Sequence, residues 1–112
     1  FRGLSGLGSR RRENAMPGLR QNNVHIDPID WRGRYGPPRT FAGTETAVGA
    51  AVAHLAARRT GDADGEEATG LMTHHLVQDD DTWQFVEQFI ALAKAHPATE
   101  WLTANDVFGI AR

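Results

Sequence analysis

The sequence contains no cysteine, and it has neither a long hydrophobic run nor an excess of charge of one sign. The missing cysteine excludes a disulfide scaffold, thiolate metal ligands and a cysteine nucleophile. No hydrophobic run approaches the roughly 18 residues that a membrane span needs. The formal charge of −2 at pH 7 gives no attraction to nucleic acid or to an anionic membrane surface. We therefore expect neither as a partner.

A length of 112 residues suits one small domain, or a part of a larger one. The chain begins at Phe1, without a methionine, in sequence typical of the interior of a domain. We therefore expect residues 1–112 to be a fragment that lacks the N-terminal part of its domain. Neither a compartment nor an oligomeric state follows from the composition.

Hydrophobic periodicity predicts two helices. Over residues 44–59, Val48, Val52 and Leu55 recur at i, i+4 and i+7, which is the spacing of one buried helix face. A second helix is expected from the acidic run at 79–81, which offers N-caps, to residue 95. The predicted buried stripe of this second helix consists of Trp83, Val86, Phe89, Ile90 and Ala93.

Short apolar segments predict strands at residues 24–26, 71–76 and 100–102, and the glycine-rich segment 1–8 is a further candidate. Thr103 and Asp106 resemble a capping box that opens a final helical turn. The alternation of strands and helices predicts an α/β fold with parallel pairing and helical crossovers. Three or four strands are too few for a closed barrel, but they suit half of one.

Polar side chains follow the first of the predicted internal strands, at the edge where α/β folds build their sites. The run is Asp27-Pro28-Ile29-Asp30-Trp31. Two carboxylates three residues apart can lie on one side of a tight turn that Pro28 begins. Trp31 is either part of the core or a flat wall for a sugar ring. The structural alternative is an Asp-Pro turn in which Asp30 caps local backbone amides.

Histidines provide the second group of candidates. His74 and His75 lie in the predicted strand 71–76. Because adjacent strand residues face opposite ways, at most one of them points into a given site, and the sequence leaves open which one. His25 and Asp27 have the spacing of two metal ligands on one strand face, but no third ligand follows at a suggestive distance along the chain.

These runs resemble the polysaccharide deacetylases of the NodB-homology type. Residues 27–31 are similar to the family's Asp-Ser/Thr-x-Asp-Trp motif, and residues 71–74 to its late Leu-x-His motif, with Met72 where leucine is usual. Gly8-Ser9-Arg10 is similar to a remnant of the arginine-bearing motif, without its usual proline and tyrosine. The resemblance implies that the chain is the C-terminal portion of a distorted (β/α)7 barrel.

The resemblance also implies a function, the hydrolysis of an N-acetyl group on a carbohydrate with the help of a divalent metal such as zinc. His74 would be the general acid, Asp30 its orienting partner, and Arg10 the partner of the catalytic base. The substrate contacts would be Trp31, Asp27 and His75.

The metal-binding motifs of the family are absent from this chain. The metal ligands are therefore expected upstream of Phe1, and we expect the fragment to be inactive alone. The alternative is a non-catalytic deacetylase-like domain that binds a glycan or serves a structural role.

Overall fold

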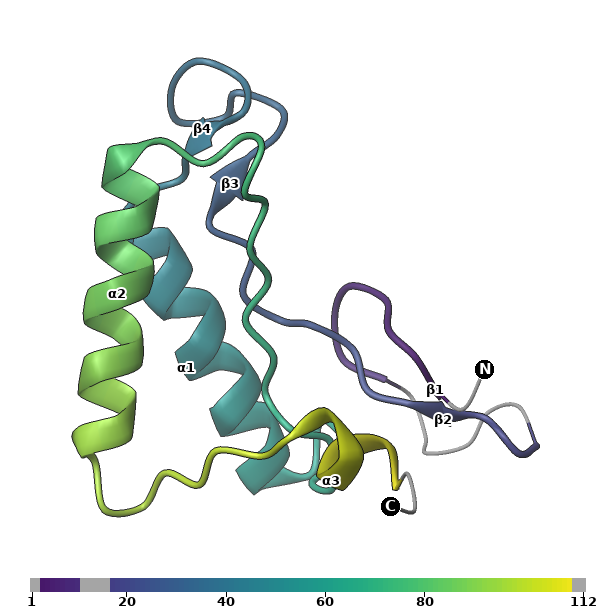
Figure 1. Ribbon diagram of the computed structural model, residues 1–112. Helices are drawn as coiled ribbons and strands as arrows, with labels where there is room; N and C mark the ends of the chain where they lie inside the picture. The colour runs from purple at the N-terminus through teal and green to yellow at the C-terminus, as the bar shows by residue number, and fades with distance from the viewer. Residues whose placement is uncertain (1–2, 11–16, 110–112) are drawn as a thin grey trace.

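The computed structural model describes residues 3–10 and 17–109 (Figure 1). Its four strands have two residues each: β1 Gly3–Leu4, β2 Arg20–Gln21, β3 Ile29–Asp30 and β4 Thr40–Phe41. Its helices are α1 Thr44–Thr60, α2 Asp80–Ala95 and α3 Ala104–Phe108. In these described ranges, no helix is both long and apolar enough to cross a membrane.

The strands form two separate sheets. β1 pairs in parallel with β2, and β3 pairs antiparallel with β4. Isolated parallel bridges join Leu7 to Val24 and Ile26 to Leu71. Figure 1 shows α1 and α2 side by side, with the β3–β4 pair near one end of them and the β1–β2 pair away from them. The described residues thus form a small α/β arrangement, and the (β/α)7 barrel stays a prediction.

The helix ends agree with their sequence signals. α1 ends at Gly61, which has a φ of 85°, a conformation that glycine adopts at little cost. α2 begins after Asp79, whose carboxylate accepts a 2.9 Å hydrogen bond from the amide of Thr82. At α3, Thr103 and Asp106 form the reciprocal bonds of a capping box. All three predicted helices are confirmed.

The predicted buried face of α1 is wrong. Val48, Val52 and Leu55 are 38%, 58% and 51% exposed, whereas Ala47 and Ala51 are 1% and 5% exposed. His54 continues the alanine row into the buried side of the helix. The small alanine side chains let α1 lie close to Ile26 and the rest of the core cluster. The polar contacts of His54 with Thr69 and Glu67 fix this orientation of the helix.

The stripe of α2 is partly confirmed. Val86 is 6% exposed, and Phe89 and Ile90 pack against the core as partly buried residues. Trp83 is 43% exposed, and Phe85, at 5%, takes the buried position instead. The ring centroid of Phe85 lies 5.4 Å from that of Phe41 and 5.6 Å from that of Phe89, within the range of favourable aromatic packing.

Of the predicted internal strands, residues 24–26 make only isolated bridges at Val24 and Ile26, and the other two are not formed. In segment 71–76 only Leu71 makes a bridge, because the chain then turns: the carbonyl of His74 accepts hydrogen bonds from the amides of Val77 and Gln78. Residues 100–102 are irregular, and Trp101 and Leu102 stay 48% and 45% exposed. Beyond the bridge at Leu71, neither segment has a bridging partner among the described residues, so β propensity alone does not produce a strand.

A pair of adjacent substitutions tests which face of α1 is buried. We expect Ala51→Leu to lower the free energy of unfolding by about 1–3 kcal/mol, because it overpacks a filled core position. Val52→Ser should change it by less than about 0.5 kcal/mol, because position 52 faces solvent. Urea denaturation followed by circular dichroism measures both. A larger loss for Val52→Ser than for Ala51→Leu would contradict the orientation described here.

Candidate functional site

Asp27 is the centre of a cluster of side chains near the surface. Its Oδ1 accepts a 3.0 Å hydrogen bond from the amide of Ile29 and lies 3.2 Å from Nε2 of His74. Its Oδ2 accepts a 2.9 Å hydrogen bond from the indole Nε1 of Trp31. The carboxylate thus contacts the backbone two residues further along the chain and the indole four residues further along. One carboxylate therefore fixes both an imidazole and an indole.

The imidazole of His74 is oriented but remains accessible. The ring centroids of Trp31 and His74 are 4.7 Å apart, in an edge-to-face arrangement at 85°. The side chain of His74 is 23% exposed, and Trp31 is 42% exposed. When neutral His74 donates its Nε2 proton to Asp27, Nδ1 is left to accept or release a proton. This is the arrangement of an acid–base residue beside an apolar platform.

Asp30 has a different role from the one that the sequence led us to expect. Its carboxylate accepts hydrogen bonds from the amides of Arg34 at 3.0 Å and Tyr35 at 2.9 Å. These bonds, that of Tyr35 first, hold the pKa of Asp30 below its usual value. The partner of His74 is thus Asp27, whereas Asp30 caps local backbone amides, as the structural alternative proposed. His75 is exposed and lies in the turn at 75–77.

Arg10 is buried and ties two distant segments together. Its Nε donates a 2.8 Å hydrogen bond to Oδ2 of Asp64, and its Nη1 donates to the carbonyl of Gln21 at 2.5 Å. The amide of Glu66 and the Arg10 guanidinium, acting against burial, keep the pKa of Asp64 below its usual value. The carboxylate that Arg10 pairs with is therefore Asp64, in the segment 61–70.

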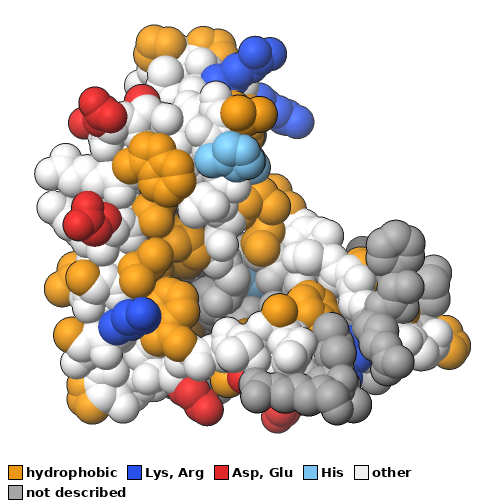
Figure 2. All heavy atoms as spheres, in the orientation of Figure 1, with side chains coloured by type: hydrophobic (Ala, Val, Ile, Leu, Met, Phe, Trp, Pro, Cys, Tyr) orange, Lys and Arg blue, Asp and Glu red, His pale blue; other side chains and the backbone are white. Residues whose placement is uncertain are grey.

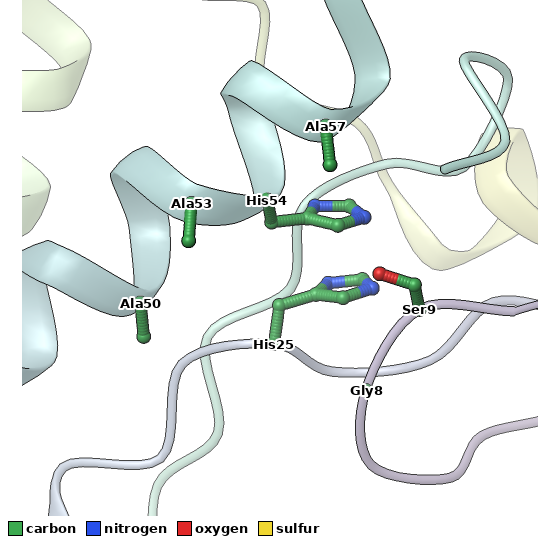
Figure 3. Close-up of a pocket in the computed structure, with 7 residues that line it drawn as sticks. All are labelled: Gly8, Ser9, His25, Ala50, Ala53, His54 and Ala57. Atoms are coloured by element: carbon green, nitrogen blue, oxygen red, sulfur yellow. The ribbon is translucent and has the colours of Figure 1, made fainter. Parts of the chain in front are cut away.

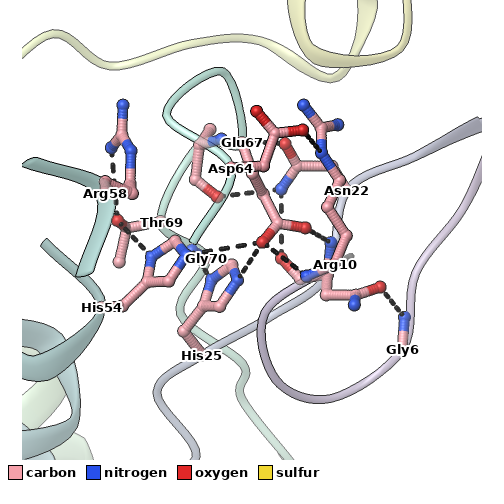
Figure 4. Close-up of polar contacts among 12 residues, drawn as sticks. Gly6, Arg10, Asn22, His25, His54, Arg58, Asp64, Glu67, Thr69 and Gly70 are labelled. Atoms are coloured by element: carbon pink, nitrogen blue, oxygen red, sulfur yellow. Dashed lines mark hydrogen bonds and ion pairs between the residues drawn. The ribbon is translucent and has the colours of Figure 1, made fainter. Parts of the chain in front are cut away.

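A second cluster, which the sequence did not indicate, is centred on Glu67. This side chain is 0% exposed. Its Oε1 accepts from the amide of Arg10 at 3.0 Å and contacts Nε2 of His25 at 2.8 Å, and its Oε2 accepts from the amide of Asn23 at 2.9 Å (Figure 4). Burial alone would raise the pKa of Glu67, but these hydrogen bonds outweigh it and lower the pKa.

His25 and His54 stack on each other beside this carboxylate. Their ring centroids are 3.4 Å apart and their planes differ by 10°. Nδ1 of His54 lies 2.8 Å from Oγ1 of Thr69, and Nε2 of His54 lies 3.4 Å from Oε1 of Glu67. Both rings line a hollow of about 290 Å³. They lie between the small residues of α1 and the segment at Gly8 (Figure 3), and the other lining residues are Gly8, Ser9, Ala50, Ala53 and Ala57.

One group of side chains in residues 3–10 and 17–109 has ligand atoms close enough for a metal site. It consists of His25, His54 and Glu67, whose nitrogen and oxygen atoms all lie within 4.8 Å of one another. Two observations oppose that role. The amide of Gly70 donates to Nδ1 of His25 at 3.0 Å, so neutral His25 carries its proton on Nε2, the atom that a metal would need. In addition, lone pairs of stacked rings run parallel and do not converge on one ion.

The cluster in this arrangement is therefore an anchor rather than a chelating site. The pairing of His25 with Asp27 that their spacing suggested is also not formed, because the two residues contact different partners: His25 contacts Glu67 and Gly70, and Asp27 contacts His74 and Trp31.

Sequence reasoning missed Glu67, Asn23 and His54. Glu67 belongs to an acidic segment that is typical of a solvated connector, and His54 lies in an alanine-rich helix. The partners of Glu67 come from residues far away along the chain, so no local spacing reports them. The two glutamates at 66 and 67 differ in the structure, since Glu66 is exposed and Glu67 is buried.

No protein-family model, curated protein or solved structure matches this chain.

We expect Zn²⁺ and Co²⁺ to leave the unfolding midpoint of the protein unchanged. A ligand that binds only the native state stabilises it by about 2.7 kcal/mol when its concentration is 100 times its Kd. Differential scanning fluorimetry with each ion measures this effect, and the absorption spectrum of bound Co²⁺ provides a second readout. A stabilisation that His54→Gln abolishes would show that the cluster does chelate a metal.

The stability of the protein should fall as the pH is lowered from about 7.5 to about 5.5. Burial, followed by the charge of His25, lowers the pKa of His54 despite the opposing effect of Glu67. The unfolded chain then binds a proton more readily than the native state, so stability is complete above about pH 6.5 and is lost as the pH falls toward the folded pKa. Thermal denaturation across this range measures the slope.

Two variants assign that slope to one residue. His54→Gln should flatten it, whatever its effect on the midpoint itself, because the titrating ring is gone. His75→Gln removes an exposed histidine and should leave the slope as it is. The same slope in His54→Gln as in the unchanged protein would contradict the assignment.

Proposed function

We propose that this chain belongs to a carbohydrate N-deacetylase, in which His74 is the general acid. The observation that carries the proposal is the contact between Nε2 of His74 and Oδ1 of Asp27 at 3.2 Å, beside a half-exposed Trp31. A carboxylate that accepts from one ring nitrogen stabilises the imidazolium and fixes the ring, which is what a proton donor at a leaving group needs. The resemblance of residues 27–31 and 71–74 to the deacetylase motifs supports the same role.

The reaction of this class converts an N-acetyl group and water into acetate and an amine. After water has added to the acetyl carbon, the bond from carbon to nitrogen breaks and the amine leaves. An amine is a poor leaving group unless it is protonated, so a proton donor is needed at that nitrogen. In our proposal, imidazolium His74 supplies this proton, Asp27 holds the ring, and the face of Trp31 contacts the sugar.

A divalent metal would activate the water and polarise the acetyl oxygen in this class of reaction. The described residues give no set that fits one, because the His25–His54–Glu67 arrangement does not converge on an ion. The metal therefore stays a proposal, with its ligands expected outside this chain, and the roles given to His74, Asp27 and Trp31 do not depend on its position.

The role of Asp27 replaces the one that the sequence suggested for Asp30. Asp30 uses both carboxylate oxygens on backbone amides of the loop that follows. Arg10 is likewise engaged with Asp64, and its side chain is 4% exposed. We therefore propose structural roles for both residues. Trp31 keeps its proposed place at the substrate, whereas Asp27 orients His74 and is not a substrate contact.

Acetate release from a chitooligosaccharide, measured with the full-length polypeptide, tests the proposal. His74→Ala should lower turnover roughly 100-fold or more, because general acid catalysis contributes that much. Thermal denaturation should show little change, since the ring is partly exposed. The matched control is His75→Ala, which removes the neighbouring exposed histidine and should retain activity.

Two outcomes would contradict this assignment. Normal turnover in His74→Ala would remove His74 from the chemistry. No release of acetate from any N-acetylated glycan, with or without added divalent metal, would favour the non-catalytic glycan-binding alternative.

A further inference from the structure

The loop between β3 and β4, residues 31–39, is strongly basic. It contains Arg32, Arg34 and Arg39, three of the 12 Lys and Arg residues of the chain, and none of its 14 Asp and Glu residues. All three arginines are exposed. Within residues 3–10 and 17–109, the ion pairs and side-chain hydrogen bonds do not involve their guanidinium groups. An otherwise acidic chain thus concentrates free positive charge in one loop.

The backbone of this loop is firmly held. Asp30 fixes its first half through the amides of Arg34 and Tyr35, and the carbonyl of Asp30 accepts a 2.8 Å hydrogen bond from the amide of Arg39. Thr40 Oγ1 donates to the carbonyl of Pro37 at 2.7 Å. Because the backbone is ordered before any ligand arrives, less conformational entropy is lost on binding.

Arg39 has a left-handed backbone conformation that other residue types adopt more readily. Its φ of 64° is the one positive φ of a non-glycine residue in the described part of the chain. Glycine or asparagine adopts this conformation more readily than arginine, whose Cβ is sterically crowded there. Residues held in this way occur often at ligand-binding positions, where the side chain is needed.

The basic loop is continuous with the His74 site. Trp31 is the first residue of the loop, and it contacts both His74 and Asp27. Tyr35, inside the loop, is 68% exposed. Figure 2 shows Lys and Arg side chains gathered at the end of the molecule where the β3–β4 pair lies, near hydrophobic and histidine side chains. Exposed rings next to guanidinium groups suit a sugar that carries an anionic group.

We propose that the β3–β4 loop selects an N-acetylated glycan that carries negatively charged groups, either carboxylate or sulfate. This inference rests on the proposed function, and it adds the charge of the substrate to it. Arg32, Arg34 and Arg39 form the selective surface, because a guanidinium pairs with two oxygens of either group at once. Trp31 and Tyr35 contact the sugar rings.

Calorimetric titration of the full-length polypeptide at low salt tests this selectivity. The probes are three tetrasaccharides: neutral chitotetraose, hyaluronan tetrasaccharide with carboxylates, and chondroitin sulfate tetrasaccharide with sulfates as well. Several exposed ion pairs contribute small amounts each, so we expect the anionic probes to bind about 10-fold more tightly than chitotetraose. Comparison of the two anionic probes identifies the group preferred.

The double substitution Arg32→Gln and Arg34→Gln should remove most of this preference and leave the binding of chitotetraose unchanged. The matched control is Arg59→Gln, which removes an exposed arginine from the last turn of α1, away from the loop, and should keep the preference. A single-stranded DNA oligonucleotide of equal charge serves as a second control, and it should bind more weakly than the anionic sugars.

The outcomes separate this inference from the proposed function. Equal binding of neutral and anionic sugars, or DNA binding as tight as sugar binding, would overturn the inference alone. Charge-selective sugar binding without acetate release from any probe would support it and overturn the catalytic role of His74. No binding of any of the sugars would overturn both.

Discussion

The buried carboxylate of Glu67 is the interaction on which the rest of the structure depends. Its oxygens accept from the amides of Arg10 and Asn23 and contact His25, so one side chain joins three segments of the chain. A buried charge without such partners would cost several kcal/mol. Gly70 follows in close contact, since a Cβ there would lie 3.0 Å from the carbonyl of Asn23. Segment 67–71 is thereby aligned with segment 22–26.

This alignment also builds the surface site. The parallel bridge between Ile26 and Leu71 sets the register of the two segments. One residue beyond Ile26 is Asp27, and three residues beyond Leu71 is His74, so the same register brings carboxylate and imidazole together. Asp27 and Asp30 then have different partners. Asp27 holds the side chains of the site, while Asp30, whose pKa lies below its usual value, stays ionised and holds the loop that follows.

Features with a local cause could be predicted from the sequence, and features with a distant cause could not. The ends of α1, α2 and α3 follow from caps within a few residues, and all three were predicted. The buried face of α1 was not, because Ala47 and Ala51 have the same periodicity as Val48 and Val52, and hydrophobicity favours the valines. The alanine face is buried instead because His54, on the same side of the helix, contacts Thr69 and Glu67 outside it. Likewise, a turn with two aspartates does not show which one reaches His74.

The ring nitrogens of His25 and His54 differ in their surroundings from those of His74, the proposed general acid. His25 uses one nitrogen on Glu67 and the other on Gly70, and those of His54 face Thr69 and Glu67. In the described residues, His74 has a partner only at Nε2. Both nitrogens of His25 have hydrogen-bond partners inside the protein, so its ring fixes segments and has no nitrogen left for a substrate. Nε2 of His54 makes no hydrogen bond, but it is buried against Glu67. His25, His54 and Glu67 therefore hold segments of the chain together. The partly exposed His74 keeps Nδ1 available, which the proposed proton transfer requires.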